Sequence, residues 1–518
     1  MSMGQYILAF DLGTGGNKAS IYDVNGNCLG SSFKSYKTFY PRPGWHEQQP
    51  EDWWKAVVCS TGELLKKSAI KKENIRCLAI SGHSMAVVPI DKKGRLLRSC
   101  IPIWSDTRAR KQAENFFNRI NYLEWYQITG NGFSKECYAV FKIMWYQDNE
   151  PNLFKNIFKV IGTKDYINYK LTGRILTDNS YASGSGVYDL KNRKYKREFI
   201  EASGLPAKIF PEIVFSHTMI GTILPEVAYG LGLSQDLTVM AGGVDNSCMA
   251  LGAGNITEGK VYLSLGSSAW IAISSKRPVI DIKIKPFVFD HVIPGLYTSA
   301  TSIFSAGSSL QWLKEIVCSN YIKEAKRSGK NIYELLIEEA MKSPIGSNGV
   351  LFNPSLAGAP AAYAAENVKG AFLGLELMHS QSDIIRAVIE GITMDLCIMY
   401  KKLEKLCPLE KEITIVGGGS KNPSWRQVFA DIFNISFIKI NIDQDAASLG
   451  ATTIAAVGMG LWKDYNKVKE IIRKEETIKP IAENVEKYKI YFSVYCRILK
   501  YLSEIGNIIE SSKIKNGY

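Results

Sequence analysis

A strand that ends in a glycine-rich turn opens the chain, and it constrains fold and function more than any other segment. Residues 6–13 are apolar apart from Asp11, and Thr14 and Gly15 follow before a second apolar strand at 19–24. Glycine lets several backbone N–H groups converge on one anion. A carboxylate beside such a turn can hold a hydrated Mg²⁺ against phosphates. The residues alone leave two interpretations open, a phosphate site or an ordinary β-hairpin.

The second half of the chain contains the same device. An apolar strand at 260–265 runs into Gly266, Ser267 and Ser268, and another apolar strand follows at 269–274. The match is one of architecture rather than of identical residues. One such unit in each half indicates two related domains, each with a turn suited to a phosphate.

Length and element pattern indicate a two-domain α/β protein. At 518 residues a single core is not expected. Three antiparallel strands followed by alternating helices and strands are typical of the ribonuclease-H-like core of actin and hexokinase. We therefore expect two such domains facing each other across a cleft, residues 1–252 and 253–518, the second with a polar, frayed tail from Ser511. Helices are predicted at 50–68, 310–342, 382–406 and from 423, and strands at 28–35, 76–81 and 412–416.

Composition excludes several classes of function. Hydrophobic residues make up 46% and charged residues 22%, as in ordinary globular enzymes, and no apolar run approaches the ~20 residues of a membrane helix. The ten Cys form no CxxC pair, which favours a reducing, cytoplasmic location. The net charge of +13 comes without a nucleic-acid-binding motif. Neither a nucleic acid nor a membrane is therefore an expected partner.

Motifs in the second half resemble one enzyme family. Residues 370–375, with Asp383 and Glu390 beyond them, match the C-terminal signature of the FGGY carbohydrate kinases, within which the chain looks xylulokinase-like. Lys142 and Trp145 match part of the N-terminal signature. Further stretches resemble the family at 11–14, 104–109, 242–246, 307–312 and 417–420.

The resemblance implies transfer of the γ-phosphoryl group of ATP, with Mg²⁺, to a hydroxyl of a small sugar. Asp245 would be the catalytic base, since a carboxylate near the attacking hydroxyl can accept its proton. Asp11 would bind the Mg²⁺. Substrate contacts are implied for Ser84, Met85, Trp104 and Asn246. Cofactor contacts are implied for Thr14, Gly15, Lys18, Gly266, Ser267, Ser268, Gly307, Gln311, Gly418, Gly419 and Asn422.

The segment expected to contact the sugar departs from bacterial xylulokinases. Those carry Met-His-Gly after Ser-Gly-Gln, whereas residues 81–86 here read Ser-Gly-His-Ser-Met-Ala. Met85 replaces the aligned histidine, and His83 stands two positions earlier as either a packed or a catalytic side chain. The usual Gly-Glu-Arg-Thr-Pro turn is also reduced, to Gly-Ala-Pro at 358–360.

These departures leave the substrate open. No Arg-Glu pair of the glycerol-kinase type is present in this region, so glycerol is not expected. The resemblance to xylulokinases implies a ketopentose such as xylulose. The alternatives are a ketohexose, gluconate or a tetritol, and, from another class, a non-kinase ATPase of the actin or chaperone fold. A homodimer is compatible with the resemblance.

Overall fold

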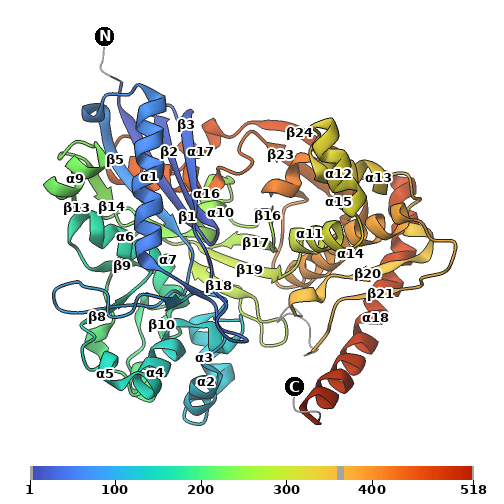
Figure 1. The fold of residues 1–518 in the computed structure, drawn as a ribbon, viewed down its shortest axis with the longest axis horizontal. Helices are drawn as coiled ribbons and strands as arrows, with labels where there is room; N and C mark the ends of the chain where they lie inside the picture. Colours follow the sequence, from blue (N-terminus) through green and yellow to red (C-terminus); the bar gives the residue numbers. More distant parts are fainter. Residues whose placement is uncertain (1–3, 359–366, 516–518) are drawn as a thin grey trace. The chain divides into compact units, whose positions relative to one another are not determined.

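The computed structural model describes residues 4–358 and 367–515, and these form two compact units (Figure 1). The first unit comprises the chain up to Glu258 together with Ser274–Ser299 and Asp445–Ile472. The second unit comprises Gly259–Ile273, Ala300–Gln444 and the chain from Arg473 onwards. The chain passes between the units five times, two of them within β-strands, so neither unit is one continuous segment.

A seven-stranded sheet organises the first unit. Its strand order is β13-β14-β5-β1-β2-β3, and β15 also pairs with β5. The first three strands are antiparallel, whereas β5 runs parallel to β1. The bounds are β1 (Tyr6–Gly13), β2 (Gly16–Asp23), β3 (Cys28–Ser35), β5 (Ile75–Gly82), β13 (Met219–Thr222), β14 (Thr238–Met240) and β15 (Gly243–Val244).

Side chains alternate along β1, so that its apolar residues Leu8, Phe10 and Leu12 share one face of the sheet and Asp11 lies on the other. Leu8, Phe10 and Leu12 are fully buried and belong to one apolar cluster with Trp53 of helix α1 (Pro50–Ser68), which packs on β2 and β3. Successive residues of a strand point to opposite faces. Asp11 therefore points to the face opposite that of Phe10. The helix begins as its sequence predicts, with Pro50 in its first turn and acidic residues after it.

Two helices far apart in sequence pack closely in the first unit. They are α10 (Asp245–Gly252) and α16 (Ala446–Gly458), and both contact β1 and β5. A Cβ at Gly252 would lie 1.8 Å from the Ala446 carbonyl oxygen, and one at Gly450 would lie 2.0 Å from the Cys248 carbonyl oxygen. Glycine is therefore required for this approach of the two helix backbones.

The second seven-stranded sheet repeats the central arrangement of the first. Its order is β18-β19-β17-β16-β22-β23-β24, with β17 antiparallel and β22 parallel to β16, as β2 and β5 are to β1. This repetition confirms the expected two-domain α/β fold. The bounds are β16 (Val261–Leu265), β17 (Ala269–Ser275), β18 (Phe287–Asp290), β19 (Tyr297–Ile303), β22 (Glu412–Val416), β23 (Ser436–Ile440) and β24 (Lys474–Ile478).

Helices of the second unit occupy the regions in which helices are predicted. The region 310–342 contains three helices, α11 (Gly307–Ile316), α12 (Ser319–Ser328) and α13 (Ile332–Ala340), because Gly329 ends α12 in the left-handed conformation. Helix α18 (Ala482–Lys515) continues past Ser511, and the frayed character expected of the tail stays a prediction. The other long helices are α14 (Gln381–Glu404) and α15 (Pro423–Phe433).

Shorter elements complete the described chain. In the first unit these include β4 (Glu47–Gln48), β6 (Val88–Ile90), β7 (Ile101–Pro102), α2 (Arg110–Phe117), α3 (Tyr122–Thr129), α4 (Ala139–Asn149), α5 (Pro151–Phe154), β8 (Lys159–Ile161), α6 (Thr163–Thr172), β9 (Leu176–Asp178), α7 (Asn179–Ala182), β10 (Tyr188–Asp189), β11 (Lys194–Tyr195), α8 (Arg197–Ser203), β12 (Glu212–Val214), α9 (Pro225–Leu231) and α17 (Lys467–Ile471). The second unit adds β20 (Leu351–Asn353) and β21 (Ala371–Leu373).

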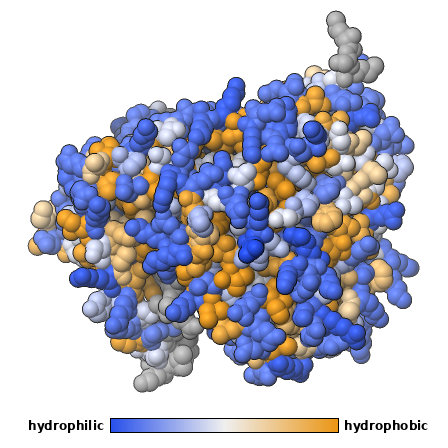
Figure 2. All heavy atoms as spheres, turned by 180° about the vertical axis from the view of Figure 1, so that it is seen from behind, coloured by the Kyte–Doolittle hydropathy of each residue, from blue (hydrophilic) through white to orange (hydrophobic). Residues whose placement is uncertain are grey.

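The surface of the described residues is largely polar on the face shown in Figure 2. Hydrophilic side chains cover much of the face shown in Figure 2, with hydrophobic residues scattered among them. Of the helices in the described ranges, none is long and apolar enough to cross a membrane. The ten cysteines are all free thiols. Two residues of the reduced turn at 358–360, Ala359 and Pro360, lie outside the described residues.

Candidate active site

Two carboxylates lie at the carboxyl ends of neighbouring strands in the first unit. Asp11 pairs with Ser81 across β1 and β5, and Ser81 Oγ donates a hydrogen bond to Asp11 Oδ1 at 3.2 Å. Asp245 directly follows β15, which runs parallel to the same end of β5, with Gly243 opposite Ser81. The carboxyl ends of parallel strands meet at one edge of a sheet. The fold therefore brings together the expected Mg²⁺ ligand and the expected base.

Burial raises the pKa of both carboxyls above the ordinary value. It raises the pKa of Asp245 to about 7, an effect that the Asn246 N–H opposes and the charge of Asp11 increases. Burial also raises the pKa of Asp11 to about 6, and Lys18 and the Ser81 hydroxyl oppose that shift. A carboxylate whose pKa lies near neutral pH is suited to accept a proton from a hydroxyl.

Asp245 begins helix α10, shortly after a pair of glycines. Gly242, with φ of +73°, makes the turn, and α10 starts at Asp245 itself. The Val244 N–H donates to Ser180 Oγ at 2.9 Å, and the Asn246 N–H donates to Asp245 Oδ1 at 2.8 Å. The carboxylate is thus fixed at a helix N-terminus, where backbone N–H groups favour negative charge.

Hydrogen bonds hold the first glycine turn from three sides. Gln48 Nε2 donates to the Thr14 carbonyl oxygen at 2.8 Å, and Trp104 Nε1 donates to Thr14 Oγ1 at 2.9 Å. The Tyr36 hydroxyl donates to the Gly13 carbonyl oxygen. Gly15 is exposed at the tip of this turn. Trp104, expected to lie against the sugar, therefore also connects the sugar region to the phosphate turn.

Lys18 forms an ion pair that the sequence did not indicate. Its Nζ contacts Asp445 Oδ1, and both side chains are partly exposed. Asp445 immediately precedes α16 and is more than four hundred residues away in the chain. No motif surrounds Asp445, so only the packing of α16 in the first unit could reveal this partner of a residue expected to contact the cofactor.

The expected sugar segment is buried and conformationally unusual. Ser84, Met85 and Asn246 are all buried, and Met85 has φ of +57°, in the left-handed region. The His83 ring packs edge-on against Trp53, with 5.5 Å between ring centroids. Burial lowers the pKa of His83 to about 3. The imidazole is therefore neutral, and this geometry agrees with the packed interpretation.

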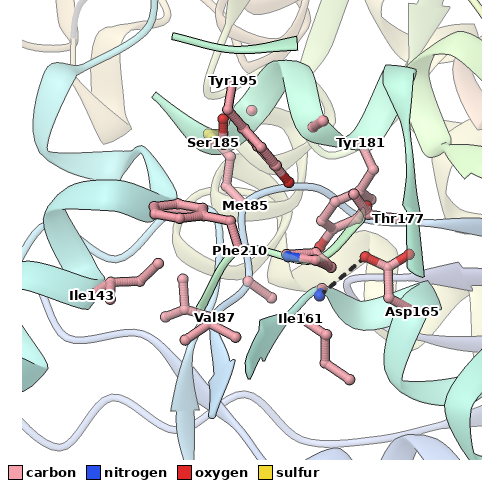
Figure 3. Close-up of a pocket in the computed structure, with 17 residues that line it drawn as sticks. Met85, Val87, Ile143, Ile161, Asp165, Thr177, Tyr181, Ser185, Tyr195 and Phe210 are labelled. Carbon is pink, nitrogen blue, oxygen red and sulfur yellow. Dashed lines mark hydrogen bonds between the residues drawn. The ribbon is translucent and has the colours of Figure 1, made fainter. Parts of the chain in front are cut away.

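A small cavity lies behind Met85 in the first unit (Figure 3). Its volume of about 40 Å³ is far below the roughly 300–1,000 Å³ of ligand pockets, so it is not the sugar site. Apolar side chains such as Val87, Ile143 and Phe210 form much of its wall, together with Asp165. The Asp165 carboxylate accepts from the Gly162 N–H at 3.2 Å.

The second unit contains a cavity of ligand size. It measures about 440 Å³, and nearly all the cofactor residues expected in this half of the chain line it: Gly266, Ser267, Gly307, Gln311, Gly418, Gly419 and Asn422. Ser268 belongs to the same turn but does not line the cavity. The sequence analysis missed other lining residues: Asn331, Tyr333, Glu334, Lys421 and Gln444. Tyr333 and Glu334 belong to α13, Asn331 precedes that helix, Gln444 lies in a loop, and Lys421 directly follows the 417–420 motif.

Backbone contacts explain the glycines around this cavity. The Gly307 N–H donates to the Gly266 carbonyl oxygen at 3.0 Å, and the Ser308 N–H donates to the Ser267 carbonyl oxygen at 3.0 Å. A Cβ at Gly307 would lie 2.5 Å from the Gly266 oxygen, so only glycine allows the approach. Asn422 caps α15 by accepting from the Ser424 N–H at 2.9 Å.

The donor set at Asp11 suits a hydrated divalent cation. No group of three or more Asp, Glu, His or Cys gathers as a metal cage in the ranges that the structure describes. Mg²⁺ commonly keeps several waters and binds through one or two carboxylates plus phosphate oxygens. The Asp11 carboxylate, with the Ser81 hydroxyl 3.2 Å away, offers oxygen ligands of this kind.

The first unit contains a pair of neighbouring carboxylates, and the second contains a glycine-lined cavity of ligand size, features that phosphoryl transfer requires. The N-terminal domain of the FGGY family of carbohydrate kinases matches residues 6–252, and the C-terminal domain of that family matches residues 261–459. The chain belongs to the FGGY family and is a carbohydrate kinase. Family membership implies a kinase reaction that uses ATP.

Individual relatives cover nearly the whole chain. A xylulose kinase of Bacillus subtilis is 31% identical, over 98% of this chain and 99% of the relative. A gluconokinase of the same organism is 26% identical, over 96% of both chains. The solved structure of a ligand-bound xylulose kinase from Lactobacillus acidophilus superimposes with a TM-score of 0.87 at 25% identity, covering 96% of this chain and 98% of that one.

Proposed function

We propose that this kinase phosphorylates a small ketose, most simply a ketopentose such as xylulose, at the expense of ATP. The observation that carries the proposal is the Asp245 carboxyl, which lies at the N-terminus of α10 beside Asp11 and whose pKa burial raises to about 7. The xylulose kinases at about 31% identity support the choice of sugar.

In the proposed reaction Asp245 accepts the proton of the attacking sugar hydroxyl. The oxygen of that hydroxyl forms a bond to the γ-phosphorus while the bond from phosphorus to the leaving ADP oxygen breaks. Ser84, Met85, Trp104 and Asn246 would orient the sugar. The cavity of the second unit would hold ATP, and Thr14, Gly15 and Lys18 would contact its phosphates.

Asp11 would hold Mg²⁺ with help from the Ser81 hydroxyl. When bound, the ion would neutralise negative charge on the phosphates of ATP. The domain division at residue 252, a homodimer and a cytoplasmic location stay predictions of the sequence analysis.

Gluconate is the second candidate substrate, because Met85 replaces the histidine of bacterial xylulokinases. Its support comes from the gluconokinase of Bacillus subtilis and from the solved gluconate kinase of Lactobacillus acidophilus, which is 25% identical with a TM-score of 0.86. The latter covers 96% of this chain and 98% of that one.

A coupled ADP-release assay tests the proposal. D-xylulose, D-ribulose, D-fructose, D-gluconate and erythritol are each added to enzyme, ATP and Mg²⁺. We expect little ATP turnover without a sugar, turnover with D-xylulose, and comparable use of at least one other substrate, since residues 81–86 differ from those of xylulokinases. Turnover that does not depend on a sugar would instead support the ATPase alternative. Exclusive use of D-xylulose would show that the change to Met85 has no effect on selectivity.

A further inference from the structure

Lys142 is a fully buried lysine on α4 to which the proposed reaction gives no role. Its side chain is 0% exposed. Its Nζ donates to the Met85 carbonyl oxygen at 3.0 Å and to the Ile103 carbonyl oxygen at 2.6 Å. Burying a lysine costs free energy unless its N–H groups are well used. The two hydrogen bonds to carbonyl groups are therefore the feature that can explain why a lysine is buried at this position.

Both carbonyl groups belong to segments that the proposed function places at the sugar. The first is that of Met85 itself, next to Ser84. The second precedes Trp104, whose indole N–H donates to Thr14 Oγ1 at 2.9 Å. One ammonium group thus joins two segments of the expected sugar site that are about twenty residues apart in sequence.

The backbone at Met85 needs such a restraint. Its φ of +57° lies in the left-handed region, which residues other than glycine adopt rarely. The side chain borders the small cavity of Figure 3, so it has free volume on one side. Met85 also packs in a buried apolar cluster, and the hydrogen bond from Lys142 additionally fixes the direction of its carbonyl group.

We propose that Lys142 is a positioning residue for the sugar, acting through the backbone carbonyl groups of Met85 and Ile103. The proposal rests on the proposed function, because it assigns the two segments to the sugar site. It predicts a specific loss of sugar affinity when the two hydrogen bonds are removed. Most of the expected nucleotide contacts line the cavity of the second unit, so the affinity for ATP is expected to change much less than the affinity for the sugar.

The main experiment replaces Lys142 by Met, which keeps the length of the side chain and removes its donors. In the ADP-release assay we expect the KM for D-xylulose to rise by about 10- to 10²-fold, as small displacements of positioning groups do. D-gluconate replaces D-xylulose if the wild type prefers it. The KM for ATP should change by less than about twofold, a split that general destabilisation would not produce.

Lys159→Met is the matched control. Lys159 Nζ also donates to a backbone carbonyl in the first unit, that of Phe210, at 2.8 Å, but Phe210 belongs to neither sugar segment. This variant should keep the wild-type KM for both substrates. Equal rises in the sugar KM of the two variants would overturn the proposal, as would an unchanged sugar KM in Lys142→Met.

A second variant keeps the proposal testable if Lys142→Met does not fold. Lys142→Gln retains an amide donor, but its shorter side chain cannot reach both carbonyl groups. The KM for the sugar should again rise while the KM for ATP stays unchanged. Similar rises in both KM values would contradict the positioning role. A wild-type enzyme that shows no sugar-dependent turnover would count against the proposed function itself, so the two failures are distinguishable.

Discussion

At the scale of single residues, the environment of Asp245 makes its role directly testable. Asp245→Asn should keep α10 intact, because the amide is nearly isosteric and Asn is tolerated at helix N-termini. The amide cannot accept the proton of the sugar hydroxyl, so the rate should fall by about 10²–10⁴ at saturating substrates. The measurement is sugar-dependent ADP release, with nucleotide affinity as the control for folding. A folded variant with near-normal turnover would remove Asp245 from the mechanism.

The same substitution makes a prediction about stability and pH. The pKa of Asp245 is raised to about 7 from an ordinary 3.8, so the folded state binds this proton more tightly than the unfolded state. The stability that the proton provides is present below about pH 4 and is lost as pH rises through about 7. Without ligands, the melting temperature of Asp245→Asn should therefore exceed that of the wild type at pH 8, and the difference should be smaller at pH 5.

Asp236→Asn serves as the control for this comparison, because Asp236 is exposed in a surface loop of the same unit. The difference in melting temperature between Asp236→Asn and the wild type should be small and similar at the two pH values. If the difference in melting temperature between Asp245→Asn and the wild type were the same at pH 5 and pH 8, the raised pKa of Asp245 would be contradicted.

At the scale of elements, the contact between α10 and α16 supports the site. A Cβ at Gly450 would lie 2.0 Å from the Cys248 carbonyl oxygen, so Gly450→Ala must push the two helices apart. We expect a loss of roughly 1–3 kcal/mol in the free energy of unfolding, as for other overpacked positions. Calorimetry would show this as a lower melting temperature.

Gly62→Ala in α1 is the matched control, since a Cβ there would meet nothing within 4 Å. It should leave stability unchanged or raise it by about 0.5–1 kcal/mol, because alanine is the better helix former. Equal melting temperatures for Gly450→Ala and the wild type would show that α10 and α16 can move apart at little cost in free energy.

At the scale of the whole molecule, ligands should protect different units. Hydrogen exchange of the full chain is measured with D-xylulose alone and with a non-hydrolysable ATP analogue alone. The sugar should slow exchange at 81–86 and at the start of α10, because these residues form the expected sugar site. The nucleotide should slow exchange at 265–268 and 417–422, which line the cavity of the second unit. Nucleotide protection confined to the first unit would contradict the assignment of that cavity.

Local patterns in the sequence were sufficient for the strand–turn–strand units and several element bounds. Strand β3 (Cys28–Ser35), helix α1 (Pro50–Ser68) and strand β22 (Glu412–Val416) have the bounds that their patterns predict. Apolar runs, glycine turns and helix-start residues act over a few neighbours, so one sequence displays them. The family motifs likewise indicated Asp11, Asp245 and most of the glycines around the larger cavity.

Only the tertiary structure decided which distant groups meet. The Lys18–Asp445 ion pair depends on α16 returning to the first unit, and the contacts of Lys142 depend on α4 lying beneath two separate segments. The bounds of the three helices within 310–342 and the start of α10 at Asp245 were also not predicted. The physical reason is that these features arise from packing between elements, whose energies depend on distances that the order of residues does not specify.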